Sequence, residues 1–258
     1  MRDCEYEFEL SGGIACLDFA NTISDRNLPV QREHLNRYED LIAFARQAGL
    51  VSDELAERLR DEAAARPEEA EATRRRAIAL REALFRLFAA VAADQAPPPD
   101  DLAHLNREMS AALEQLRVGR RDGGRSGLHP GVPDPAAEPR PGTQPQDRVP
   151  GRRTGGGTRH PAPDRRPGGL PGTRAFGWMW DGSASRLDAP LWPLARQAAE
   201  LLVAPERERV RECAAGDCHW LFLDTSKNRS RRWCDMKSCG NRAKVRSFYR
   251  RKRATRAG

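Results

Sequence analysis

Apolar residues recur every three or four positions in several stretches between residues 39 and 204, the spacing that places them on one face of an α-helix. The clearest stripes are Leu41, Ile42, Ala45 and Ala48; Leu80, Leu84, Leu87 and Val91; Leu102, Leu105, Met109, Leu113 and Leu116; and Leu191, Leu194, Ala198 and Leu201. Stripes of this kind face a core. The pattern predicts a mainly α N-terminal domain with a small β element.

Residues that start or end helices stand at the edges of these stretches. Gly49 supplies a left-handed stop after the first helix, and the proline run 97–99 ends the helix that contains Leu80. The expected N-terminal signals are Ser52, Pro67, Asp100 or Asp101, and Asp188 with Pro190. Five helices are therefore expected, the second of them beginning at Ser52.

Two glycines, Gly12 and Gly13, interrupt the apolar run of residues 8–22. A glycine pair can belong to a phosphate-binding loop. No GxGxxG or GxxxxGK[ST] pattern follows, however, and no lysine is placed to meet a phosphate. The run therefore predicts a turn into a short buried helix or strand.

Residues 117–174 follow neither a helical nor a strand period. Of these 58 positions, 36 are Gly, Pro or Arg, and Ile, Phe, Tyr, Trp, Met and Lys do not occur. Such a composition cannot bury enough apolar surface to order itself. Two interpretations stay open. The segment is a disordered Gly/Pro/Arg-rich linker, or it is out of frame, since GC-rich codons read in another frame produce this amino-acid composition.

This pattern divides the chain into a helical domain of residues 1–116 plus 175–204, the segment 117–174, and a C-terminal unit of residues 205–258. In the last unit, residues 210–213 and 220–223 suit short strands, and residues 224–228 have turn chemistry. Residues 241–253 form an uninterrupted helix, whose stripe of Val245, Phe248 and Tyr249 is expected to face a small core. The C-terminal unit is therefore expected to be a small α+β, treble-clef-like fold.

Four of the six cysteines lie in this unit: Cys213, Cys218, Cys234 and Cys239. They read Cys-x4-Cys, fifteen residues, Cys-x4-Cys, which is the paired spacing of a tetrahedral metal site, and the fifteen-residue span is long enough for a β-hairpin between the pairs. Four thiolates complete the shell of one Zn²⁺ and leave no position for an activated water. We therefore expect a single structural zinc ion that folds the unit.

Positive charge is concentrated in the same unit. From Arg207 onward there are 16 Lys and Arg against five Asp and Glu, a formal +11, whereas residues 1–206 carry −4. A basic cluster on a small folded unit favours a phosphate backbone as the partner, the alternative being a solubilising tail.

Ten residues of this unit are the candidate contacts to nucleic acid: Lys227, Arg229, Arg231, Arg232, Asn241, Arg242, Lys244, Arg246, Arg250 and Arg251. Asn pairs bidentately with adenine and Arg with guanine, so Asn241 and Arg242 could read base edges. The alternative for these two is structural, because residues just after a metal ligand often donate hydrogen bonds to thiolate sulfur.

The same residues carry a resemblance to a known family. The chain has Cys213, Cys218, Phe222, Asp224, the run Arg231-Arg232-Trp233-Cys234 and, above all, Cys239-Gly240-Asn241-Arg242. This set resembles a CGNR zinc finger, a module thought to bind DNA. The resemblance implies a transcription regulator.

A weaker resemblance covers most of residues 8–116 and 176–204. The GG-x3-LDF-x-NT run, the helix that ends in Ala48-Gly49-Leu50 and the Leu-Trp-Pro helix before the finger are similar to the ABATE domain, the usual N-terminal companion of CGNR fingers. That family is labelled as stress-induced regulators. The resemblance implies an effector or dimerisation domain and specifies no effector ligand.

We therefore expect a zinc-dependent regulator that binds double-stranded DNA, with the helical domain as an effector or dimerisation module; in the second case the protein would be a homodimer. RNA or ribosome binding is the second hypothesis, because phosphate attraction does not distinguish the polymers. A thiol redox or metal sensor is the third. No nucleophile, base and orienting group occur at a recognisable spacing, so no enzymatic activity is expected. Free thiolates and the lack of a signal or membrane-spanning segment indicate a cytoplasmic, nucleoid-associated protein without membrane contact.

Overall fold

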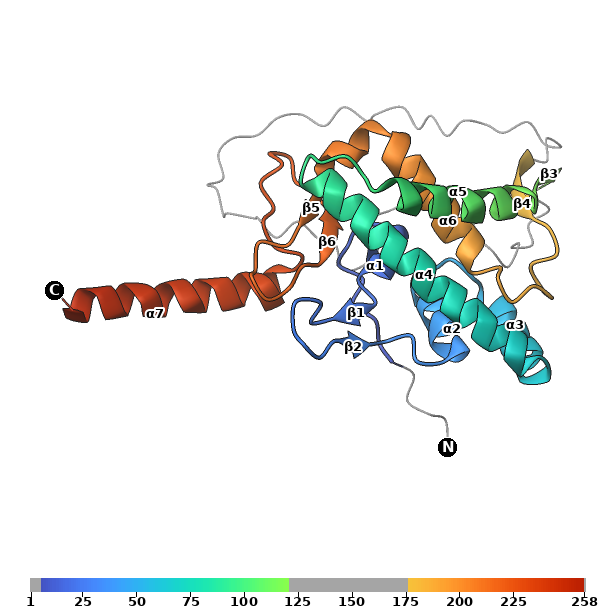
Figure 1. Ribbon diagram of the computed structural model, residues 1–258, viewed down its shortest axis with the longest axis horizontal. Helices are drawn as coiled ribbons and strands as arrows, with labels where there is room; N and C mark the ends of the chain where they lie inside the picture. Colours follow the sequence, from blue (N-terminus) through green and yellow to red (C-terminus); the bar gives the residue numbers. More distant parts are fainter. Residues whose placement is uncertain (1–5, 121–175, 258) are drawn as a thin grey trace, which may run out of the picture.

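The computed structural model describes residues 6–120 and 176–257 (Figure 1). Its α-helices are α1 (Ala15–Ala20), α2 (Tyr38–Gln47), α3 (Asp53–Ala65), α4 (Pro67–Ala92), α5 (Pro99–Leu113), α6 (Leu191–Val203) and α7 (Asn241–Ala257). The strands are β1 (Ile23–Ser24), β2 (Arg32–Glu33), β3 (Leu116–Arg120), β4 (Phe176–Trp180), β5 (Val210–Glu212) and β6 (Leu221–Leu223). A 3-10 turn, η1 (Pro205–Arg209), and a π-helical turn, η2 (Met236–Gly240), complete them.

The predicted fold class is confirmed. A mostly helical N-terminal part with small strands is followed by a small cysteine-rich β/α region (Figure 1). From residue 121 onward, the segment predicted to be a linker or out of frame lies outside the described residues. None of the helices in the described ranges combines the length and the apolar character needed to cross a membrane.

Most of the predicted helix boundaries are confirmed. The Ser52 hydroxyl caps α3 by accepting a hydrogen bond from the Leu55 N–H at 3.2 Å. Gly49 has a φ of +68°, the left-handed conformation that ends a helix without a side-chain clash. Pro67 is the first residue of α4, and α6 begins directly after Pro190.

The fourth helix differs from its prediction in two respects. Neither Asp100 nor Asp101 caps α5, because the helix already begins at Pro99, and the Asp101 carboxylate binds the Arg86 guanidinium at 2.6 Å. The predicted stripe is also rotated: Leu102 is 43 % exposed and Leu113 is exposed too. The face that packs against α4 and α6 buries Leu105 and Ala112 together with two acids, Asp101 and Glu108, which pair with arginines of α4.

Residues 117–120, expected to belong to the linker, are part of a sheet. β3 pairs antiparallel with β4, with Leu116 opposite Trp180 and Arg120 opposite Phe176. Trp180 is buried and packs against Trp192 of α6, with ring centroids 5.8 Å apart. Composition alone does not predict this strand. Residues 117–120 are ordered by pairing with β4, which lies beyond residue 175 in the sequence.

The short helix α1 lies at the centre of the core. All six of its residues are buried, and it contacts α4, α6 and β6. The Asp18 carboxylate of α1 accepts a hydrogen bond from the Gly12 N–H, and a Cβ at Gly12 would come within 2.8 Å of that carboxylate. The glycine pair therefore makes a tight turn into a buried helix, as predicted.

The β5–β6 hairpin joins the cysteine-rich region to this core. Val210 and Leu221 are completely buried in the main apolar cluster. Asn21, at the end of α1, donates to the Leu221 carbonyl at 2.8 Å and accepts from the Leu221 N–H at 2.9 Å. The Leu223 N–H donates to the Gly12 carbonyl at 2.8 Å. The segment around α1 thus provides the hydrogen bonds that another strand would provide to the free edge of β6.

We predict that Asn21→Ala destabilises the whole chain, because it leaves the buried N–H and C=O of Leu221 without partners. Each unsatisfied buried group costs about 1–3 kcal/mol. Denaturant unfolding of the full chain measures the loss. The matched control is Asn36→Ala, which removes one exposed hydrogen bond to the Glu33 carbonyl and should change stability little. Equal losses in the two variants would contradict the role assigned to Asn21.

Candidate metal centre and nucleic-acid interface

The first cysteine pair lies in the connection of the β5–β6 hairpin. Cys213 follows β5 and donates its N–H to the Trp220 carbonyl at 2.8 Å, while the Cys218 N–H donates to the Ala215 carbonyl at 3.0 Å. The expectation of a hairpin between the two cysteine pairs is wrong, since the strands flank the first pair. The Asp224 carboxylate accepts backbone N–H groups from Ser226 and Arg231, which keeps this stretch a loop.

The second cysteine pair is placed by the start of α7. Cys239 lies within η2, one turn before α7, and the Asp235 carboxylate caps η2 by accepting the Ser238 N–H at 2.7 Å. The Ala214 N–H donates to the Arg232 carbonyl at 2.8 Å, which ties the loop of the first pair to the segment before Cys234. Local capping and this one cross-link bring the two pairs together.

The four cysteine sulfurs converge on one point. All four are buried and lie within 4.8 Å of one another, with Cys234 Sγ 3.6 Å from Cys218 Sγ and 3.6 Å from Cys239 Sγ. These separations exclude a disulfide, whose sulfurs are about 2.0 Å apart. A tetrahedron with metal–sulfur bonds of about 2.3 Å has edges of about 3.8 Å. The donor set therefore fits one tetrahedrally bound metal ion.

The thiols influence one another's ionisation strongly. Hydrogen bonds with Cys218 and Cys234 lower the pKa of Cys213, while the hydrogen bond with Cys213 raises the pKa of both Cys218 and Cys234. Adjacent sulfurs cannot all carry negative charge unless a cation compensates them. The cluster is thus suited to a divalent cation, which makes four thiolates compatible with one another.

Arg242 supports the sulfur cluster from α7. Its guanidinium donates to Cys239 Sγ at 3.0 Å, and this bond raises the pKa of Arg242. A second nitrogen of the same guanidinium lies 3.7 Å from the Asp217 carboxylate in the loop of the first cysteine pair. Arg242 therefore connects both halves of the cluster and balances part of the thiolate charge.

Arg231 closes the loop between the cysteine pairs. Its guanidinium donates to the carbonyls of Ser11 at 2.9 Å and Trp233 at 3.0 Å, and also to that of Cys234. It also lies over the Phe222 ring, 4.4 Å from the centroid. Because Ser11 belongs to the segment before α1, this one side chain fixes the cysteine-rich region against the helical part.

Two family models match the chain. The ABATE model, described as "Putative stress-induced transcription regulator", matches residues 13–205, which is more than half of the chain. The CGNR zinc finger model matches residues 209–252, a range that includes all four cysteines of the cluster. The chain belongs to the ABATE family and carries a C-terminal CGNR zinc finger. No curated protein matches the chain.

Four of the ten predicted contacts in the CGNR finger have acidic partners or internal roles. Arg246 binds the Asp217 carboxylate at 2.6 Å, Arg229 lies 3.7 Å from Glu208, and Arg231 is used inside the loop as described. Arg242, a fourth, donates to Cys239. These four arginines are therefore wholly or partly engaged within the protein.

The remaining six candidate contacts either have no acidic partner among the described residues or have side chains that are not described. Lys227, Arg232, Asn241 and Lys244 have no acidic partner within the part of the chain that the structure describes. Arg232 lies over the Trp233 ring at 5.5 Å. The side chains of Arg250 and Arg251 lie outside the described residues. The finger therefore leaves part of its positive charge open to a partner.

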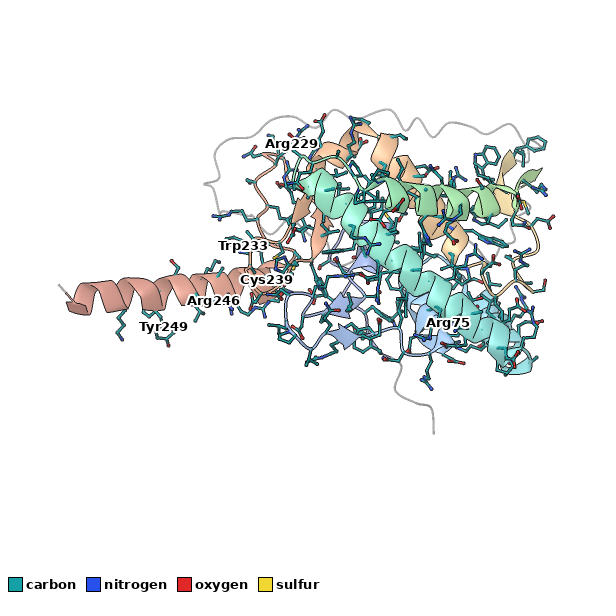
Figure 2. The ribbon with its side chains drawn as sticks, in the orientation of Figure 1. Arg75, Arg229, Trp233, Cys239, Arg246 and Tyr249 are labelled. Carbon is teal, nitrogen blue, oxygen red and sulfur yellow. The ribbon has the colours of Figure 1, made fainter. Side chains whose placement is uncertain are left out.

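The apolar stripe of α7 is exposed, contrary to expectation. Phe248 is 56 % and Tyr249 is 58 % exposed, and Val245 is exposed as well. The finger core instead consists of the four cysteines with Ala215 and Phe222, flanked by Trp220 and Trp233. α7 extends away from the rest of the molecule, with Cys239 and Arg246 at its attached end and Tyr249 pointing outward (Figures 1 and 2).

Sequence reasoning missed Asp217 and Asn21 as residues that organise the site. Asp217 is an acid inside the Cys-x4-Cys loop of a strongly basic finger, a signal that it would pair with nearby arginines. Asn21 gave no comparable signal, because its partner Leu221 is 200 residues away.

We predict that Arg242→Ala weakens metal retention in the CGNR finger by about tenfold or more, the usual effect of removing a residue that supports a metal ligand. Competition with a chromogenic chelator measures the change. Arg246→Ala is the matched control, since it removes the same charge from the same helix but only an exposed contact to Asp217. If both variants lose metal equally, the bond to Cys239 has no special role.

Proposed function

We propose that the chain is a zinc-dependent DNA-binding transcription regulator, in which a structural Zn²⁺ holds the CGNR finger and basic residues bind duplex DNA. The helical ABATE part serves as an effector or dimerisation module. The family membership and the cysteine cluster support this proposal. Thiolate ligands persist in a reducing compartment, which supports a cytoplasmic location with access to DNA as part of the proposal.

The identity of the metal follows from its donors. Four thiolates in a tetrahedron are typical of structural zinc sites, and they leave no coordination position for a substrate or water. Cys213, Cys218, Cys234 and Cys239 would hold the ion, and Arg242 would balance part of their charge. The ion would lock the hairpin, the loop and the start of α7 into one unit.

The observation that carries the proposal is the charge of α7. Residues 241–257 contain eight Lys and Arg and no Asp or Glu, and the helix leaves the body of the protein without packing its far end against it (Figure 1). A helix whose charged residues are all cationic repels a second copy of itself and attracts a polyanion. Phosphate backbones are the polyanions that such a helix binds.

We predict that the full chain purifies with one zinc per molecule and unfolds at lower temperature after treatment with a strong chelator, because the ion's binding energy contributes to folding. Native mass spectrometry and thermal unfolding measure the two effects. Cys234→Ser should resemble the chelated protein, whereas Cys4→Ser, which changes a thiol outside the two pairs, should retain the metal. If the unfolding temperature is the same before and after metal removal, the structural role of zinc is contradicted.

We further predict that the zinc-loaded chain binds duplex DNA with an affinity that falls steeply as salt increases, since each phosphate contact releases a counterion. Competition between labelled duplex, single-stranded DNA and structured RNA, monitored by fluorescence anisotropy, is the measurement. Duplex DNA should compete best. The chelated protein is the control and should lose the interaction.

One observation favours RNA as the second candidate. Phe248 and Tyr249 are exposed side by side on α7, with ring centroids 5.6 Å apart, and exposed aromatic rings stack on unpaired bases. If structured RNA or single strands compete more strongly than duplex DNA, the second candidate function, RNA binding, replaces duplex DNA binding.

A further inference from the structure

A groove lies at the root of α7, beside the metal cluster. Its volume is about 490 Å³, and it is formed by three segments: the loop of the first cysteine pair, the residues just before Cys234, and the first two turns of α7. The lining residues are Ala214, Ala215, Gly216, Arg232, Trp233, Ala243, Lys244, Arg246 and Ser247. Figure 2 shows Trp233 and Arg246 together at this end of the helix.

The groove is positively charged along its walls. Arg232 and Lys244 come from opposite sides, one from the loop and one from α7, and neither has an acidic partner among the described residues. Arg246, the third cation, is already neutralised by Asp217 at 2.6 Å. Two uncompensated cations that line one cavity form a site for an anion.

The shape of the groove leaves room for such a ligand. Apart from Trp233, its uncharged wall residues are small: three alanines, a serine and Gly216. A Cβ added at Gly216 would meet no atom within 4 Å, so the space beside it is open. The Arg232 guanidinium lies over the Trp233 ring at 5.5 Å, which holds this long side chain against one wall.

A repeating polyanion fits the position of the groove better than a lone ion does. Further along α7 the sequence has four consecutive cations, residues 250–253, of which Lys252 is exposed in the described structure. A free phosphate would occupy only the root of the helix, whereas a polymer could contact the groove and the helix together.

We propose that the groove binds one backbone phosphate of nucleic acid through Arg232 and Lys244, and thereby sets the position at which α7 begins on the polymer. This inference rests on the proposed function and specifies its site. Arg242 and Arg246 are bound to Cys239 and Asp217, whereas Arg232 and Lys244 have no acidic partner among the described residues.

The test uses the full, zinc-loaded chain and compares Arg232→Gln, Lys244→Gln and the double variant with wild type. The double variant should make the plot of log affinity against log salt shallower by about 0.9, the value expected for one lost duplex phosphate contact, and each single variant should produce a smaller change in the same direction. Arg75→Gln is the matched control: it removes an exposed charge of α4, far from the groove, and should leave the slope unchanged (Figure 2).

A second pair of variants tests the cavity itself. Gly216→Glu places a carboxylate at the open wall and should weaken duplex binding at least as much as the double variant, whereas Gly216→Ala should bind like wild type. Unfolding curves and zinc content confirm that each variant is folded. These measurements distinguish weaker duplex binding caused by a blocked groove from weaker binding caused by unfolding.

Three results would overturn the inference. If wild type binds DNA and the double variant keeps the full salt slope, the groove is not a phosphate contact while the proposed function stands. If inorganic phosphate saturates the groove at millimolar concentration and the variants abolish that binding without changing DNA affinity, the site serves a small anion. If zinc-loaded wild type binds neither DNA nor RNA, the proposed function and this inference both fail.

Discussion

The convergence of four cysteine sulfurs on one point is the constraint on which the C-terminal part of this protein depends. Four thiolates repel one another, and the thiols share protons through hydrogen bonds that lower the pKa of Cys213 and raise the pKa of Cys218 and Cys234. The chain nevertheless holds the sulfurs at separations that match one tetrahedral ion. Backbone hydrogen bonds of the hairpin and the capped η2 turn position the four cysteines around this point.

The hairpin that carries the first cysteine pair is anchored in the helical part. Val210 and Leu221 lie in the main core, and Asn21 pairs with both backbone groups of Leu221. Arg231 adds a bond to Ser11 on the other side of the hairpin. An ABATE part and a finger that share core residues and buried hydrogen bonds are expected to gain stability together. A change in the helical core could therefore reach the finger through α1 and β6.

The basic residues of the finger divide into two groups. Arg231, Arg242 and Arg246 satisfy carbonyls, a thiolate and a carboxylate within the protein. Arg232 and Lys244 line a groove with no acidic neighbour among the described residues. Net charge alone therefore overstates the surface available to a polyanion, because a guanidinium with five donors is also the side chain best suited to joining loops.

The sequence by itself determined the features that depend on local chemistry: the helix starts at Ser52 and Pro67, the stop at Gly49, and the four paired cysteines that can hold a metal ion. Capping and ligand spacing act over a few residues, so they can be recognised without the fold. Only the tertiary structure decided which face of α5 is buried, that residues 117–120 form a strand, and that Val245, Phe248 and Tyr249 are exposed. It also decided which arginines turn inward and that Asn21 holds β6. Each of these depends on a partner distant in the sequence, and an amphipathic pattern does not state whether a packing partner exists.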